Sequence, residues 1–410
     1  MPLRPSTLSR VTSDYPSATE DAAEGGQVRA STLELFFDLV FVFTITQLTH
    51  AFTHHPGWEA LAQVALMFGV IWWMYAGYVW LTNEVAPNSS NRRTWLLVGM
   101  FGFFVLALAI PGAFGGSGLA FGLAYILIVA VHAAMFATSG AEGSSAILRI
   151  APFNTLSAGL VLAGGIIHGW PRYLLWALAF GVQIASPYII HGGGFVVRVS
   201  HFVERHGLVI IVALGESVVA IGTGLAGRDI TVPLVATVAL GLTLVYVLWW
   251  AFFGIDDERG EHVLESLPSA DRTRAAVTAY DYAFYALLVG IILAAAGISM
   301  TIAHGNEPAS TAAALALSGG VALYFLGQFL FRWVLALARP WLRLIAAAAV
   351  FATAPIGVVW VAWGQLAILV LVGYGFVIFD DILAVRDGQG GKYLARTHID
   401  TARHLRRPRD

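Results

Sequence analysis

The stretch STLELFFDLVFVFTITQLTH (residues 31–50) is long and apolar enough to cross a bilayer as a single α-helix. Glu34 and Asp38 nevertheless lie in its first two turns, four residues apart and therefore on one helical face. A helix N-terminus tolerates carboxylates because its dipole favours negative charge. Two explanations follow: an ion pair with an arginine such as Arg149 or Arg205, or a place on the path of a substrate or proton.

The rest of the chain is equally apolar. Of its 410 residues, 58% are hydrophobic and 12% are charged, and the mean hydropathy is +0.74. Soluble domains have about a quarter of their residues charged, so this composition indicates a polytopic membrane protein with lipid around it. The net charge of −2 excludes nucleic acid as an expected partner, since no tract has the basic density that binding phosphates requires. The absence of cysteine excludes disulfides and thiolate chemistry.

Apolar runs of about 20 residues, separated by polar or Gly/Pro-containing breaks, predict an all-α integral membrane protein with twelve transmembrane helices. Their approximate limits are 33–52, 58–81, 94–114, 117–138, 147–167, 172–190, 206–227, 231–254, 275–303, 311–337, 341–361 and 364–383. An even number of spans places both termini on the same side of the membrane.

The distribution of Lys and Arg indicates which side that is, because these residues gather in cytoplasmic loops. Of the 23 in the chain, only Arg172 and Arg228 fall on the other side when twelve spans are assigned. We therefore expect both termini in the cytoplasm of a bacterial inner-membrane protein. Residues 1–30 have the composition of a disordered tail, and the basic tail over residues 385–410 either contacts anionic lipid or sets the topology.

The two halves of the chain look alike. VIWWMYAG (residues 70–77) closes the second span and VLWWAFFG (residues 247–254) closes the eighth, while Glu34 opens the first span as Glu204 precedes the seventh. This order predicts two tandem six-helix repeats of the same orientation. The halves would occupy residues 31–200 and 201–384. The alternative is that the paired tryptophans are ordinary interfacial residues.

Ionisable residues inside spans cost about 2.5–3.5 kcal/mol at mid-helix, so each needs an explanation. Glu216, in GLVIIVALGESVVAIGTG (residues 207–224), lies about 15 Å into the membrane when counted from His206 at about 1.5 Å per residue, with Ser217 beside it. Asp281 lies about two turns into the ninth span. Glu216 either exchanges a proton and binds substrate, or remains protonated in a hydrogen bond to a neighbouring helix.

HFVERHG (residues 201–207) places His201, Glu204, Arg205 and His206 just before the seventh span. Histidine titrates near neutral pH, so this cluster suits a pH-sensing or gating role. The spacing of the two histidines does not match the zinc-binding helix pattern, and no metal site is expected. The chain also lacks nucleotide-binding and nucleophile-elbow motifs, and no cofactor is expected.

ELFFDLVFVF (residues 34–43) and HFVERHGLVIIVALGESVVAIG (residues 201–222) together resemble the bacterial low temperature requirement protein A family. The similarity runs from about residue 30 to residue 384. It implies a multi-pass bacterial inner-membrane protein, first connected with growth in the cold. The acidic residues of the family correspond to Glu34, Asp38, Glu204 and Glu216 of this chain. The chain departs from the family pattern at Phe284, where a histidine is common.

The leading hypothesis is a proton- or cation-coupled secondary transporter of a small molecule or ion. In this hypothesis Glu216 binds the coupling ion, Asp38 and Asp281 line the cytoplasmic path, and Glu204 with Arg205 forms a gate pair. The first alternative is an intramembrane enzyme acting on a lipid-like substrate, with acids and histidines of the first and seventh spans as general acid and base. The second is a structural or sensory membrane protein without turnover, in which every acid lies in a satisfied pair.

Overall fold

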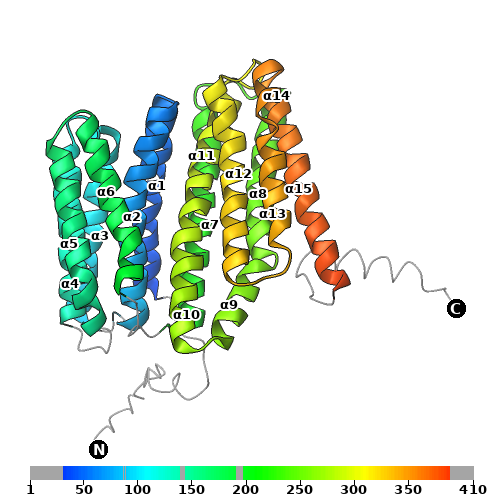
Figure 1. Cartoon of the computed structure of the whole chain (residues 1–410). Coiled ribbons are helices and arrows are strands. Elements are labelled where there is room, and N and C mark those ends of the chain that lie inside the picture. The colour runs from blue at the N-terminus through cyan, green and yellow to red at the C-terminus, as the bar shows by residue number, and fades with distance from the viewer. Residues whose placement is uncertain (1–30, 86, 88, 139–143, 191–196, 388–410) are drawn as a thin grey trace, which may run out of the picture.

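The structure is a computed structural model, and it is all-helical in the residues that it describes (Figure 1). The described residues are 31–85, 87, 89–138, 144–190 and 197–387. Eleven helices in these ranges are long and apolar enough to cross a membrane, which confirms an all-α, multi-pass membrane protein. The predicted disordered tail over residues 1–30 and nearly all of the predicted basic tail lie outside the described residues.

The first six long helices run alternately up and down. They are α1 (Thr32–His54), α2 (Trp58–Glu84), α3 (Ser90–Ala109, continued by a 3₁₀ turn at Ile110–Gly112), α4 (Gly118–Ala137), α5 (Ser144–Ile166) and α6 (Trp170–Ile190). The 23-residue helix α5 packs between α4 and α6. Together with the eleven, it makes twelve long helices in the described residues, which fits the number that the sequence predicts.

The second group contains several composite helices. They are α7 (Val199–Leu225), α8 (Val232–Phe253) with its extension α9 (Asp256–Ser266), α10 (Ser269–Ala276) joined through a π-helical turn at Val277–Tyr282 to α11 (Ala283–Ala303), α12 (Thr311–Val334), α13 (Pro340–Phe351) with α14 (Ala354–Val359), and α15 (Ala362–Arg386). Helix α7 begins seven residues before the predicted span at residue 206, so the HFVERHG motif is helical. A polar motif can be part of this membrane helix because most of its polar side chains are buried against neighbouring helices.

The same packing pattern occurs in both groups. In the first, α1 packs on α2 and α3, α3 on α4, α4 on α2 and α5, and α6 on α2 and α5. In the second, α7 packs on α8 and α11, α11 on α12, α12 on α8 and α13, and α15 on α8 and α13. Each helix of the first group thus has a counterpart six spans later with corresponding neighbours.

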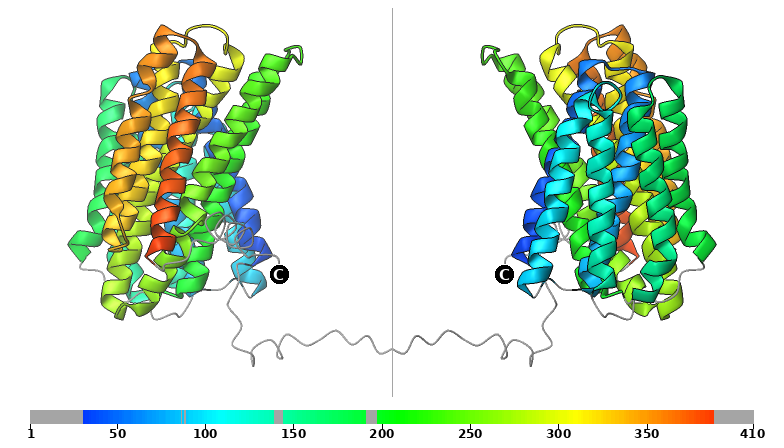
Figure 2. Two further views of the ribbon diagram at one scale, coloured as in Figure 1. Left: turned by 90° about the vertical axis from the view of Figure 1, so that its right-hand side faces the viewer. Right: turned by 90° about the vertical axis from the view of Figure 1, so that its left-hand side faces the viewer.

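The two groups meet along a seam, which we define as the contacts of α1 and α2 with α7 and α11. The start of α1 and the end of α15 lie at the same end of the bundle (Figure 1). At the opposite end, the α7–α8 hairpin leans away from the other helices (Figure 2). The helices therefore form two groups, and the seam is the contact between them.

Glycines bring α11 and α12 into close contact inside the second group. A Cβ atom on Gly297 would lie 2.5 Å from the backbone of Leu317, and one on Gly320 would lie 2.4 Å from the backbone nitrogen of Ala294. Contacts this short leave no room for any side chain, because a backbone atom cannot move aside as a flexible side chain can. The neighbouring Gly319 has only Phe351, at 3.8 Å, near its Cβ position.

We predict opposite effects for alanine at these two adjacent glycines. Gly320→Ala should lower the melting temperature, with a loss of about 1–3 kcal/mol from overpacking. Gly319→Ala should leave it unchanged or raise it, because alanine favours a helix over glycine by about 1 kcal/mol. Thermal melting of both variants in the same detergent tests the α11–α12 contact, and equal melting temperatures would contradict it.

Candidate functional site

The start of α1 is fixed by a capping box. The Glu34 amide donates to the Ser31 hydroxyl oxygen at 3.4 Å, and the Glu34 carboxylate accepts from the Ser31 amide at 2.8 Å and from its hydroxyl at 2.7 Å. The other oxygen of this carboxylate, Oε1, lies 3.2 Å from His201 Nε2 on α7. Glu34 therefore caps its own helix and also contacts the second group of helices.

One turn further, Asp38 and Arg205 form an ion pair across the seam. Arg205 Nη1 donates to Asp38 Oδ2 at 3.0 Å, and Nη2 lies 2.9 Å from Oδ1, so the pair is bidentate. The Tyr75 hydroxyl on α2 donates to the same carboxylate. Both charged side chains are at most 2% exposed. Two-point geometry and a third donor compensate for the desolvation of the two charges.

His206, on the next position of α7, faces Asp281. Its Nδ1 lies 2.9 Å from the carbonyl oxygen of Phe202, so Nδ1 carries the hydrogen and donates it to this backbone acceptor. Its Nε2 lies 3.7 Å from Asp281 Oδ1, beyond hydrogen-bond distance. In the neutral imidazole, two acceptors therefore face each other across a short gap, which a proton or a cation would fill.

Asp281 lies in the π-helical turn between α10 and α11. The indole N–H of Trp80 donates to its Oδ2 at 3.2 Å, and the indole N–H of Trp72 donates to its backbone carbonyl at 2.7 Å. Phe284, where the family resemblance expects a histidine, is packed edge-on against His206 at 5.4 Å. A π-helical turn inside an α-helix occurs frequently at functional sites, and here it holds an acid between the two groups.

Glu216 lies deeper along α7 and contacts α1. Its Oε2 accepts from the Thr46 hydroxyl at 2.5 Å, and the side chain is 1% exposed. Within the described ranges, no basic side chain lies within ion-pair distance of it. Ser217, beside it, is also buried. A carboxyl in this environment needs either a bound proton or a bound cation.

Most of the residues singled out in the sequence are thus gathered at the seam. Asp38 has the ion pair with Arg205 that the sequence offered as one explanation for an acid at this helix start. Glu204 is exposed, whereas Arg205 directs its guanidinium to Asp38. The gate pair of Glu204 and Arg205 stays a prediction.

A second buried charge cluster, which the sequence did not reveal, lies inside the second group. Arg332 on α12 donates to Asp256 at 3.0 and 2.8 Å and to Asp380 on α15 at 2.6 Å, and Arg343 on α13 lies 3.2 Å from Asp380. The sequence counted both arginines only among the Lys and Arg residues of the cytoplasmic side. The available signal was the acidic pair in VIFDDIL, residues 377–383, near the end of an apolar span.

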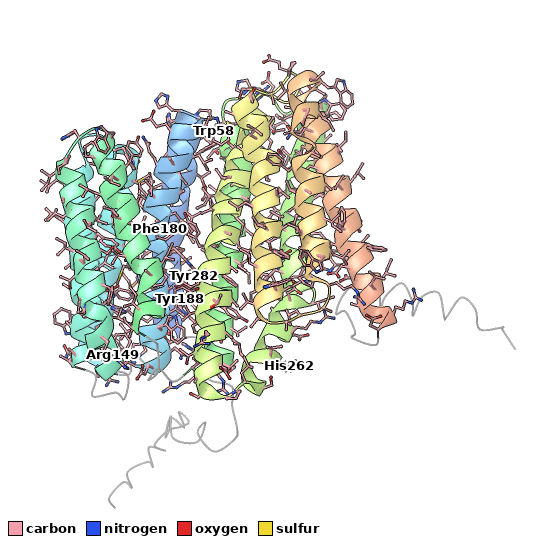
Figure 3. All side chains as sticks on the ribbon, in the orientation of Figure 1. Trp58, Arg149, Phe180, Tyr188, His262 and Tyr282 are labelled. Atoms are coloured by element: carbon pink, nitrogen blue, oxygen red, sulfur yellow. The ribbon has the colours of Figure 1, made fainter. Side chains whose placement is uncertain are left out.

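A cavity of about 100 Å³ lies beside Asp281, between α2, α4, α5 and α6 of the first group and α10 with the π-helical turn of the second. Its walls are mostly apolar and include Trp73, Trp80 and Phe136, with Arg149 and Asn154 as polar members. Figure 3 shows Tyr188 of α6 beside Tyr282 of the π-helical turn. Their rings stack at 5.8 Å, and Tyr282 also packs on Trp73 at 5.8 Å.

The arrangement provides proton-exchanging and charge-binding groups on both sides of the seam. Glu34 and Asp38 on α1 face His201 and Arg205 on α7 across the seam, and His206 faces Asp281 within the second group. In the part of the chain that the structure describes, no group of three His, Asp or Glu side chains is arranged to hold a metal ion.

The fold and this site define a polytopic membrane protein with a buried ionisable network between two groups of helices. The sequence model of the bacterial low temperature requirement A protein matches residues 29–378, and the chain belongs to this family. The chain is also similar to an uncharacterized protein of Rhizobium meliloti (strain 1021), with 27% identity over 314 residues that cover 73% of this chain and 76% of the relative. The resemblance found in the sequence is confirmed, and the family match includes every residue of the seam.

The ion pair of Asp38 and Arg205 should show strong energetic coupling. Asp38→Asn alone leaves a buried guanidinium without its counter-charge and should destabilise the protein by about 3–5 kcal/mol. Adding Arg205→Gln should cost less than the sum of the two single changes, because the second change removes the unpaired charge. Unfolding midpoints of the two single variants and the double variant give this coupling.

The exposed pair of His262 and Glu265 provides the control. Glu265→Gln should leave the unfolding midpoint unchanged, because exposed ion pairs contribute little. Additive effects of Asp38→Asn and Arg205→Gln would contradict the pairing in the seam.

Proposed function

We propose that the protein is a proton- or cation-coupled secondary transporter of the bacterial cytoplasmic membrane, with both termini in the cytoplasm. The observation that carries this proposal is the buried ionisable network across the seam. Ionisable residues inside a membrane are costly, and they mark ion and substrate pathways more often than structural positions. A bundle held together only for stability needs no charges between its two groups of helices, since small and apolar residues pack them at lower cost.

The repeated pattern of helix contacts in the two groups supports this proposal. The corresponding helix contacts in the two groups are those expected of parallel repeats, the architecture in which many transporters bind their substrate at the repeat interface. The contact between Thr46 and Glu216 adds to this support. These residues are 170 positions apart, which is the same offset that relates Glu34 to Glu204. Side chains at equivalent positions meet where a two-fold axis passes between parallel helices.

In the proposed mechanism the two halves rock about the seam. The ion pair of Asp38 with Arg205 and the contact of Glu34 with His201 close the cytoplasmic side, and both must separate when that side opens. Glu216 takes up the coupling proton or cation near the middle of α7. Asp281 lies on the cytoplasmic path beside the cavity.

The enzyme alternative has less support in the site's geometry. It requires Glu34 and Asp38 of α1 to converge with His201, Glu204 and His206 of α7 on a space that a lipid-like substrate can enter. Glu34 contacts His201 and Asp38 contacts Arg205 across the seam, and none of the five residues lines the cavity beside Asp281.

A thermal-shift screen of the purified protein against soluble metabolites and lipids, at two pH values, tests the proposal. A ligand that binds only the folded state adds about 2.7 kcal/mol of stability at a hundredfold excess over its dissociation constant. We expect a soluble ligand whose stabilising effect depends on pH in the wild type and not in Glu216→Gln. The exposed Glu265→Gln should behave like the wild type.

Two results would oppose the transporter. One is a Glu216→Gln variant that is less stable and yet keeps the full pH dependence of ligand binding. The other is a screen in which only lipids stabilise the wild type, because the structural and enzymatic alternatives would then account for the network better.

A further inference from the structure

The residues that line the cavity beside Asp281 are those of a binding site and not of a packing defect. It lies between the two groups of helices, with α2 and α4–α6 on one side and α10 with the π-helical turn on the other. Its lining combines a carboxylate, an amide and a guanidinium with aromatic rings: Asp281, Asn154 and Arg149 among Trp73, Trp80 and Phe136. A ligand site of this kind is mostly apolar with a few polar groups that fix orientation.

The tryptophans give the cavity a wall suited to a positive charge. Trp73 and Trp80 are seven residues apart on α2 and so lie on the same helical face, and both line the cavity. The negative face of an indole ring attracts cations within about 6 Å, and the attraction is stronger when water is excluded. An organic cation with an apolar body matches this wall better than a hydrated metal ion.

Asp281 supplies the counter-charge. It is 5% exposed, and its Oδ1 has no hydrogen-bond partner among the described residues. His206 Nε2, which faces Oδ1 at 3.7 Å, has none either. Trp80 donates to this carboxylate through its indole N–H, at Oδ2. Oδ1 is enclosed, and His206 does not line the cavity, so a ligand in the cavity would compensate the charge of the carboxylate without contacting Oδ1. The negative charge of a buried carboxylate is costly without a positive partner.

Arg149 limits the charge of such a ligand. It also lines the cavity, at the start of α5, and it is exposed. A second positive group on the ligand would be repelled there, whereas a single ammonium near Asp281 is not opposed by any other cation of the cavity wall. His132, the remaining basic member of the wall, is hydrogen-bonded to the Gly77 carbonyl at 3.0 Å.

We infer that this cavity binds a small monovalent organic cation, such as a primary or quaternary amine, with its ammonium group beside Asp281 and its apolar body against Trp73 and Trp80. The inference rests on the proposed function, because it names the class of substrate that the transporter carries. The stacked rings of Tyr188 and Tyr282 join the two groups of helices next to Trp73, so movement of the two halves would change access to the bound cation.

Isothermal titration of the full-length protein with three molecules of one shape tests this inference. The probes are choline, its neutral carbon analogue 3,3-dimethylbutan-1-ol, and the anion 3,3-dimethylbutanoate. We expect choline to bind with one site per chain and the neutral analogue to bind about tenfold more weakly or not at all, since only the cation gains from the carboxylate and the rings. The anion should not bind.

Variants locate the site. Asp281→Asn keeps an acceptor for the Trp80 indole and should lower choline affinity about tenfold. Trp73→Leu should lower it several-fold, and it carries the test if Asp281→Asn does not fold. The exposed Trp333→Leu on α12 is the matched control and should bind like the wild type. Equal affinity for choline and its neutral analogue, tighter binding of the anion, or unchanged binding in both cavity variants would overturn the inference.

The outcome separates this inference from the proposed function. If choline binds in an Asp281-dependent way but is not taken up by proteoliposomes, the site stands and the transporter proposal fails. If choline does not bind while another soluble ligand stabilises the protein in a Glu216-dependent way, the transporter proposal stands and the substrate class is wrong.

Discussion

The burial of Arg205 is the constraint on which the seam depends. A guanidinium that is 1% exposed in a membrane needs a counter-charge and well-placed acceptors, and Asp38 provides both through a bidentate contact. Because Asp38 is on α1 and Tyr75, which donates to the same carboxylate, is on α2, this requirement fixes α1, α2 and α7 relative to one another. Glu34 with His201 on one side, and the indole N–H groups of Trp72 and Trp80 with Asp281 on the other, add further contacts between the two groups.

The two buried charge clusters have different consequences because of where they lie. The cluster of Arg332, Asp256, Arg343 and Asp380 joins helices of the second group only, and together with the α11–α12 glycine contacts it holds that group as one unit. The seam network joins the two groups. Breaking the seam contacts would therefore release one group from the other while leaving the second group intact, which is what rocking of two halves requires.

Much of this could be predicted from the sequence, for identifiable reasons. Apolar runs of about 20 residues predict helices directly, because lipid leaves the backbone no other partner. The cost of charge in a span likewise identified Glu34, Asp38, Glu216 and Asp281 as residues that needed partners. Which partner each acid would find depends on helix rotation and depth, which hydropathy does not contain. Thus the sequence offered Arg205 both as an ion-pair partner of the α1 acids and as a gate partner of Glu204, without deciding between them. The π-helical turn at Asp281 was not foreseen, and Arg332 was counted only among the cytoplasmic arginines although its side chain is buried among acids.

The most direct test of the account is a distance measurement between spin labels on the two halves, for which this cysteine-free chain is well suited. One pair of labels at Asn91 and Glu265 reports the end of the bundle where α1 begins, and a second at Trp170 and Glu307 reports the opposite end. If the seam network holds the halves together, Asp38→Asn should lengthen the first distance and shorten the second in a folded protein. Distances that are the same in the wild type and in folded Asp38→Asn would contradict the claim that this network controls the relative position of the halves.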